Sequence, residues 1–215
     1  MRFEILLVYM IIIRKIKLYK IDKKIVNESV NHLAKGGILI YPADTCYGVG
    51  VDFTNKNSIL NLSILKNRKE DKHFSIIVPD FNWIKQNSVI NKNQEETLRK
   101  NLPGEFTFIL KTKNKEIDSP TLGIRIPNNL YCQMIVRKLN NPIVSTSANI
   151  SGENNPYTTA DLEKGILKRT QYINDDIFVL NAGELIKDKI STVVDLTKDP
   201  FEIVRQGSGK LIYNL

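Results

Sequence analysis

A run of small hydroxyl side chains with one amide occupies residues 144–152, where the sequence reads Val-Ser-Thr-Ser-Ala-Asn-Ile-Ser-Gly. It follows an apolar segment, residues 142–144, so the pattern predicts a strand that ends in a polar loop. Such a loop offers hydroxyl, amide and backbone N–H groups to a small, oxygen-rich ligand. A serine-rich turn that binds only its own backbone would look the same locally. The interpretation therefore depends on the rest of the chain.

Basic and polar groups that suit an anionic ligand lie on both sides of this run. Lys66 and Arg68 stand two positions apart, and together they offer a point charge and a planar fork for phosphate oxygens. A basic pair at a helix end can also simply complement the helix dipole. Polar elements at residues 41–48, 191–195 and 205–207 extend the pattern along the chain.

These segments together resemble the threonylcarbamoyl-AMP synthase family, whose YrdC-like domain begins the synthesis of the t6A modification of tRNA. The resemblance covers roughly residues 22–210 and depends on the order of several short motifs. The motifs are Asp44-Thr45-x-Tyr47-Gly48, Lys66-x-Arg68, Pro103-Gly104-x-x-Thr107, Gly123-Ile124-Arg125-Ile126-Pro127, Ser147-x-Asn149, Ser191-Thr192-Val193 and Arg205-x-Gly207. Each motif alone is weakly specific, whereas their shared order is specific.

The resemblance implies an α/β (α+β) fold, in which a twisted mixed β-sheet with flanking helices forms a large concave pocket. It implies a single YrdC-like domain over residues 22–215, with residues 1–21 as an N-terminal extension of uncertain status. The length of 215 residues and the ordinary apolar and charged content agree with one globular domain.

The resemblance also implies a reaction. Family members use ATP, L-threonine and bicarbonate: the threonine amine becomes a carbamate, and a carbamate oxygen attacks the α-phosphate. Pyrophosphate leaves and threonylcarbamoyl-AMP remains. Mg²⁺ is expected with ATP, whereas neither a covalent enzyme nucleophile nor a metal site built from side chains is implied. Catalysis of this kind depends on positioning two anions and neutralising charge on the transferring group.

Residue roles follow from the matched motifs. The catalytic set implied is Lys66, Arg68, Ser147 and Asn149. ATP is expected to contact these four together with Lys72, Thr107 and Arg205. L-Threonine and bicarbonate are expected to contact Asp44, Thr45, Tyr47, Lys111, Arg125, Ser191 and Thr192. A threonine such as Thr107 is also a common strand former, and His73 is expected to be a packing residue rather than a ligand.

Two positions depart from the family pattern. Ala43 stands where the familiar form has a threonine, which removes a hydroxyl expected to meet the amino-acid substrate. Ile77 stands where one subgroup has a histidine that contacts threonine.

Two other interpretations stay open. A YciO-like paralogue with weak or different nucleotide-dependent activity is favoured by Ala43 and by the sequences of residues 73–75 and 103–111. That branch tends to lose the Ser147-x-Asn149 element, however, which this chain keeps together with Lys66-x-Arg68. A non-catalytic RNA-binding module would instead use a basic concave surface, although no aromatic RNA-binding signature is present.

The net charge is compatible with all of these interpretations and does not distinguish between them. The net charge of +8 and the isoelectric point near 9.3 suit ATP or tRNA, yet lysine is abundant throughout the chain. The expected macromolecular partners are the downstream t6A transferase machinery and, through a weak contact, tRNA, a largely double-stranded RNA.

The cysteines, histidines and apolar segments bear on the cellular compartment. Two cysteines and two histidines without metal-ligand spacing indicate neither a disulfide framework nor a zinc site, so a cytoplasmic protein is expected. The apolar stretch at residues 3–13 is far shorter than the roughly 20 residues of a membrane span, so no membrane association is expected. An edge strand, or a true start at Met10, is the expected explanation of that stretch.

Several elements must position these groups. Periodicity predicts helices near residues 25–34, 57–67, 94–101 and 131–139. It predicts strands at residues 38–41, 49–53, 74–78, 106–111, 122–126, 143–145, 177–180, 192–196 and 201–205. Strands outnumber helices and several are adjacent, which favours a mixed sheet over a strictly alternating parallel one.

Overall fold

Short runs of β-branched and aromatic residues separated by turn residues give the chain its many strands. A computed structural model describes residues 10–68, 74–114, 117, 119–187 and 190–213. Its strands are β1 (Ile11–Lys15), β2 (Ile38–Pro42), β3 (Tyr47–Asp52), β4 (Ser75–Ile77), β5 (Ser88–Val89), β6 (Phe106–Thr112), β7 (Thr121–Arg125), β8 (Ile143–Ser147), β9 (Ile177–Asn181), β10 (Thr192–Asp195) and β11 (Glu202–Arg205). Its helices are α1 (Lys23–Ala34), α2 (Lys56–Lys66), α3 (Phe81–Asn87), α4 (Lys92–Asn101), α5 (Leu130–Leu139), α6 (Thr159–Lys164) and the 3₁₀ helix η1 (Ile166–Tyr172).

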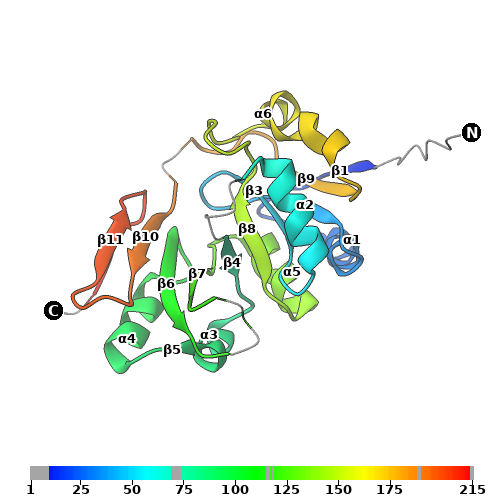
Figure 1. The fold of residues 1–215 in the computed structure, drawn as a ribbon. Helices are drawn as coiled ribbons and strands as arrows, with labels where there is room; N and C mark the ends of the chain where they lie inside the picture. Colours follow the sequence, from blue (N-terminus) through cyan, green and yellow to red (C-terminus); the bar gives the residue numbers. More distant parts are fainter. Residues whose placement is uncertain (1–9, 69–73, 115–116, 118, 188–189, 214–215) are drawn as a thin grey trace, which may run out of the picture.

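The strands join one sheet in the order β1-β9-β2-β3-β8-β4-β7-β6-β10-β11, with β5 paired to β6 (Figure 1). The sheet combines parallel pairs, such as β4 with β7 and β10 with β6, and antiparallel pairs, such as β3 with β8 and β6 with β7. The expected twisted mixed sheet with flanking helices is therefore confirmed.

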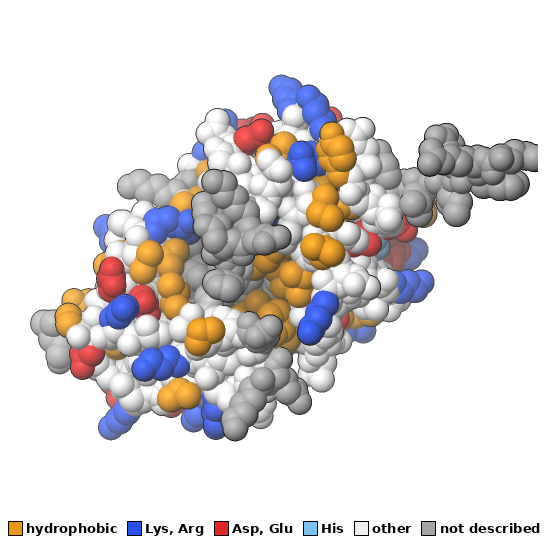
Figure 2. Space-filling view, viewed as in Figure 1, with side chains coloured by type: hydrophobic (Ala, Val, Ile, Leu, Met, Phe, Trp, Pro, Cys, Tyr) orange, Lys and Arg blue, Asp and Glu red, His pale blue; other side chains and the backbone are white. Residues whose placement is uncertain are grey.

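Helices cover the sheet and complete two apolar cores. Helices α1 and α5 pack against each other and, with strand residues such as Leu39 and Ile143, enclose the smaller core. Helices α2, α3, α4 and α6 contribute to the larger core, which continues along the strands to β10. In Figure 2, hydrophobic side chains gather toward the middle of the face drawn, while lysine and arginine side chains lie mostly around its outline.

The N-terminal part of the described chain belongs to the sheet. Residues 11–15, which the sequence assigned to an extension, form β1 and pair in parallel with β9, and Ile16 reaches the smaller core. The edge-strand explanation of this stretch is thus confirmed for these residues. No helix among the described residues is long and apolar enough to cross a bilayer.

Some local expectations were wrong. Strand β3 begins at Tyr47, two residues before the expected start at residue 49, and all of its residues are buried because β2 and β8 flank it and helices cover the sheet. Elements α3, β5, α6 and η1 were not predicted, since they are too short to show a periodic pattern. Strand β8 also runs to Ser147, so this serine lies on the strand rather than in the loop beyond it.

Candidate functional site

A cavity of about 470 Å³ opens onto the central strands, and we call it the arginine cavity. Among the described residues that line it, three are arginines and none is acidic. Its hydroxyl-bearing lining residues are Thr45, Ser75, Thr107, Thr121, Ser145, Thr146, Ser147 and Ser191, and its arginines are Arg68, Arg125 and Arg205. The cavity therefore offers positive charge and many hydrogen-bond donors to an anionic ligand.

Strand alternation builds the cavity floor. Ser75 of β4, Gly123 of β7 and Ser145 of β8 lie side by side in register and share one face of the sheet. A Cβ atom at Gly123 would lie 3.2 Å from the Ser75 hydroxyl and 3.3 Å from the Thr107 methyl group. The glycine therefore keeps the middle of the floor open.

Asp44 and Arg125 form a mostly buried ion pair at one wall. The Arg125 Nη2 donates to the Asp44 carboxylate over 2.8 Å, and their side chains are only 12% and 6% exposed. The other Asp44 oxygen accepts the backbone N–H of Asn128 over 3.0 Å. The Arg125 Nε is buried without a partner among the described residues. Asp44 thus holds the arginine in place and does not itself line the cavity.

Arg205 approaches the cavity from β11. Its Nη2 donates to the Ser191 carbonyl over 2.9 Å and to the Ser191 hydroxyl over 3.1 Å. That hydroxyl also lies 3.1 Å from the Thr107 Oγ1. Partial burial of the guanidinium and, to a smaller extent, the positive charge of Arg125 lower the pKa of Arg205. Arg125 and Arg205 bring positive charge to the same cavity, which suits an anionic ligand.

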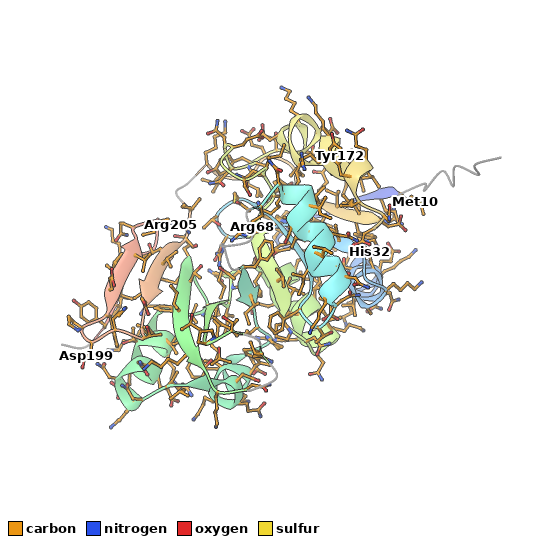
Figure 3. All side chains as sticks on the ribbon, viewed as in Figure 1. Met10, His32, Arg68, Tyr172, Asp199 and Arg205 are labelled. Atoms are coloured by element: carbon orange, nitrogen blue, oxygen red, sulfur yellow. The ribbon has the colours of Figure 1, made fainter. Side chains whose placement is uncertain are left out.

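Arg68 reaches the same cavity from the end of α2 (Figure 3). The helix ends at Lys66, and Asn67 adopts a left-handed conformation with a φ of 51°, which turns the chain before Arg68. The Arg68 guanidinium stacks over the Phe74 ring with a distance of 4.3 Å to the ring centroid. Arg68 of the Lys66-x-Arg68 motif therefore lines the arginine cavity, whereas Lys66 does not.

The Lys66 side chain points into the protein rather than into the cavity. Its ammonium donates to the Ser147 carbonyl over 2.5 Å, to the Asn149 carbonyl over 2.7 Å and to the Asn149 Oδ1 over 3.1 Å. The Ser147 hydroxyl donates to the same Asn149 oxygen over 2.6 Å. Lys66 is only 2% exposed, and burial followed by the charge of Arg68 lowers its pKa to about 7. Lys66 thus fixes the Ser147-x-Asn149 turn from behind.

Other expected contacts fall outside the cavity wall. The Tyr47 hydroxyl donates to the Gly183 carbonyl and accepts the Ala182 N–H, which fastens the loop after β9. The Thr192 hydroxyl donates to the Gly209 carbonyl, and Lys111 is exposed on β6. Neither these three residues nor Asn149 line the cavity. Lys72 and His73 lie outside the described residues.

The structure adds lining residues that the motifs did not single out. Ser145 accepts a 2.6 Å hydrogen bond from the Tyr41 hydroxyl, and Ser75 lies next to it in the register. The signal for Ser145 was present, because Ser145 and Ser147 are two residues apart and must share one face of a strand. Cys46 also lines the cavity, and burial raises the pKa of its thiol.

A metal site built from side chains is not found in the described part of the chain. No group of three or more His, Cys, Asp or Glu side chains is placed there to hold an ion.

The mixed sheet and its arginine cavity place the chain in a class of α/β proteins whose concave, positively charged site lies over the central strands. The family model described as telomere recombination, which covers the Sua5, YciO and YrdC proteins, matches residues 31–207. The chain belongs to this Sua5/YciO/YrdC family.

Known relatives span most of the chain. A protein of Methanocaldococcus jannaschii named as a threonylcarbamoyl-AMP synthase is 32% identical over 200 residues, covering 89% of this chain and 92% of the relative. The crystal structure of Escherichia coli YciO matches with a TM-score of 0.78 at 25% identity, covering 94% of this chain and 98% of that one. Sua5 of P. abyssi in complex with L-threonine matches with a TM-score of 0.80 at 21% identity. That match covers 92% of this chain and 57% of the longer Sua5 chain, and it shows the fold alone.

Proposed function

We propose that this protein is an L-threonylcarbamoyladenylate synthase, a nucleotidyltransferase that makes threonylcarbamoyl-AMP and pyrophosphate from ATP, L-threonine and bicarbonate for the tRNA t6A37 modification. The observation that carries the proposal is the arginine cavity, in which three arginines and a set of hydroxyls line one space without an acidic residue among the described lining. Relatives named threonylcarbamoyl-AMP synthase support the same reaction, and the L-threonine bound to the structural neighbour Sua5 agrees with an amino-acid substrate.

In this proposal, different walls of the cavity bind different parts of the substrates. Arg68, with Thr107 and Ser147, would hold the phosphates of ATP, while Arg125, with Thr45, would hold the threonine carboxylate or the carbamate. Arg205 would neutralise charge near the leaving pyrophosphate. Each role uses charge-assisted hydrogen bonds, which strengthen where water is excluded. Mg²⁺ would enter on the ATP phosphates and add charge neutralisation there.

Lys66 acts through the turn that it holds. By binding the carbonyls of Ser147 and Asn149, it would keep the Ser147 hydroxyl aimed at the nucleotide. In this proposal Lys66 and Asn149 are positioning residues, whereas Arg68 and Ser147 touch the substrate. The two reacting species, ATP and the carbamate of threonine, are both anionic, so the catalytic gain would come from orientation and charge neutralisation.

A pyrophosphate-release assay tests the reaction class. Purified protein with Mg²⁺, ATP, bicarbonate and L-threonine is expected to release pyrophosphate, and omission of threonine or bicarbonate is expected to abolish the release. The adenylate product should be identified by mass spectrometry. Release that continues without threonine, or no release with all substrates present, contradicts the proposal.

Ala43 offers a second prediction, on amino-acid selectivity. Ala43 lines the cavity close in sequence to Thr45, so a hydroxyl introduced there would reach the proposed threonine site. A pocket with a polar partner for a substrate hydroxyl discriminates better than an apolar wall, whose methyl contact is worth roughly 1–3 kcal/mol. Ala43→Thr is expected to lower the KM for threonine or raise the threonine-over-serine ratio of kcat/KM, with little change for ATP.

The matched control for Ala43→Thr is Ala43→Val, which adds similar volume without a hydroxyl. If both variants behave alike, the hydroxyl is not the cause. Unchanged kinetics with both amino acids in folded Ala43→Thr would show that Ala43 only packs beneath the loop.

A second candidate function is a YciO-like enzyme with different nucleotide-dependent chemistry. The E. coli YciO sequence is 28% identical over 195 residues, and Ala43 was one of the features that favoured this branch. ATP turnover that ignores threonine would select this candidate. The t6A transferase machinery, and tRNA through a weak contact, remain the proposed macromolecular partners of the synthase.

A further inference from the structure

A second cavity, of about 620 Å³, lies against the same central strands on their other face. Its floor contains Ile76, Leu122 and Val144, and the residues next to them in sequence, Ser75, Gly123 and Ser145, line the arginine cavity. Successive strand residues point to opposite faces, so the two cavities are separated by the sheet. Helices α2 and α3 supply side walls. We call this space the tryptophan cavity.

Three aromatic rings, Phe53, Phe74 and Trp83, line the tryptophan cavity, and each is only partly buried. The volume lies within the roughly 300–1,000 Å³ typical of small-molecule sites, which are mostly apolar with a few fixed polar groups. Asn87 is such a group: its amide donates to the Trp83 carbonyl over 2.9 Å and accepts from Asn114 over 3.1 Å. These two hydrogen bonds hold the Asn87 side chain in place at the wall.

Two side chains that carry hydrogen-bond donors line this space. These are Trp83, with its indole N–H, and Lys56, the exposed first residue of α2. Lys56 is the single charged residue within the described lining, and none of that lining is acidic. Aromatic walls favour a flat ring, and the two donors favour hydrogen-bond acceptors and a negative charge.

We propose that the tryptophan cavity binds a small, flat heteroaromatic molecule that carries an anionic group such as a carboxylate. The ring stacks against Trp83 and Phe74, and the anionic group lies toward Lys56. This site is separate from the proposed synthase reaction, and its existence does not depend on it. Phe74 lines both cavities and carries the Arg68 guanidinium at 4.3 Å, so an occupant that touches Phe74 lies one side chain from the arginine cavity.

The indole N–H signal of Trp83 can report ligand binding in this cavity, because Trp83 is the only tryptophan in the sequence. In ¹⁵N-labelled full-length protein, the single indole N–H resonance can be followed while nicotinate, nicotinamide or cyclohexanecarboxylate is added. We expect a saturable shift with nicotinate, weaker binding of the uncharged nicotinamide, and the weakest binding of cyclohexanecarboxylate, which has the charge but no aromatic ring.

Lys56→Gln should weaken nicotinate binding about threefold to fivefold, as expected for an exposed ion pair, and leave nicotinamide binding unchanged. The matched control is Lys92→Gln, because Lys92 is also an exposed first residue of a helix that follows an asparagine N-cap. Ser63→Phe, which places a ring in the cavity from α2, should abolish the shift.

Three outcomes would overturn the proposal: an indole resonance that no probe shifts in folded protein, equal binding of nicotinate and cyclohexanecarboxylate, or equal losses in Lys56→Gln and Lys92→Gln.

Discussion

Asp44→Ala is expected to lower the free energy of unfolding by about 3–5 kcal/mol, because removal of one partner leaves a buried charge uncompensated. The Arg125 side chain is only 12% exposed, and its Nε already lacks a partner among the described residues. The substitution also removes the carboxylate that accepts the Asn128 N–H. Urea-induced unfolding of the purified variant measures the loss.

A double-mutant cycle separates the pair from its surroundings. Arg125→Met in the Asp44→Ala background should recover part of the lost stability, since it removes the unpaired charge. The surface pair Arg14–Glu28, whose side chains are 44% and 28% exposed, is the matched control. Glu28→Ala should cost less than about 1 kcal/mol. Similar losses in Asp44→Ala and Glu28→Ala would show that burial of the Asp44–Arg125 pair does not matter.

Lys66→Met is expected to reduce turnover by about 10- to 100-fold, although the Lys66 side chain does not line the arginine cavity. The variant removes the donor to three oxygens of the Ser147-x-Asn149 turn, and a small displacement of a positioning group can cost about 100-fold. The backbone contact from the Ser151 N–H to the Lys66 carbonyl survives the change. Steady-state pyrophosphate release measures the effect, with the exposed Lys23→Met on α1 as the control.

The pH dependence of stability tests the same lysine independently of activity. Burial lowers the pKa of Lys66 to about 7, whereas the unfolded chain keeps a pKa near 10.5. Between these values the unfolded state binds more protons, so the free energy of unfolding should rise with pH from about 7 toward 10. Lys66→Met should lack this rise. Parallel pH profiles for the variant and the unmodified protein would contradict the burial of an ionisable Lys66.

The sequence predicted well which segments lie close together in the fold. It predicted less well the directions in which their side chains point. The order of motifs was enough to bring Arg68, Thr107 and Arg205 to one cavity, and strand periodicity predicted most of the sheet. The direction of a side chain depends on contacts that are distant in sequence. Lys66 points inward because residues 147–149, far along the chain, surround it with oxygens.

Tyr47 and Thr192 illustrate the same limit. Both carry hydroxyl groups suited to a polar substrate, but these groups bind the backbone near residues 182–183 and 207–209. Local pattern cannot distinguish a hydroxyl that faces a ligand from one that satisfies a neighbouring loop. The ion pair between Asp44 and Arg125 joins residues 81 positions apart, so no periodic signal could reveal it.

The walls of the arginine cavity differ in the free energy of local opening, and the wall that contains β11 opens more easily. This four-residue strand carries Arg205 and, among the strands that the structure describes, pairs with β10 alone. All of its residues are exposed, and its register is irregular at Val193 and Val194. Such segments open at a free energy well below that of global unfolding. The amide hydrogens of β11 should therefore exchange with solvent long before those of β8 at the opposite wall. Arg205 is thus carried by a segment that opens locally, whereas the wall formed by β8 stays protected.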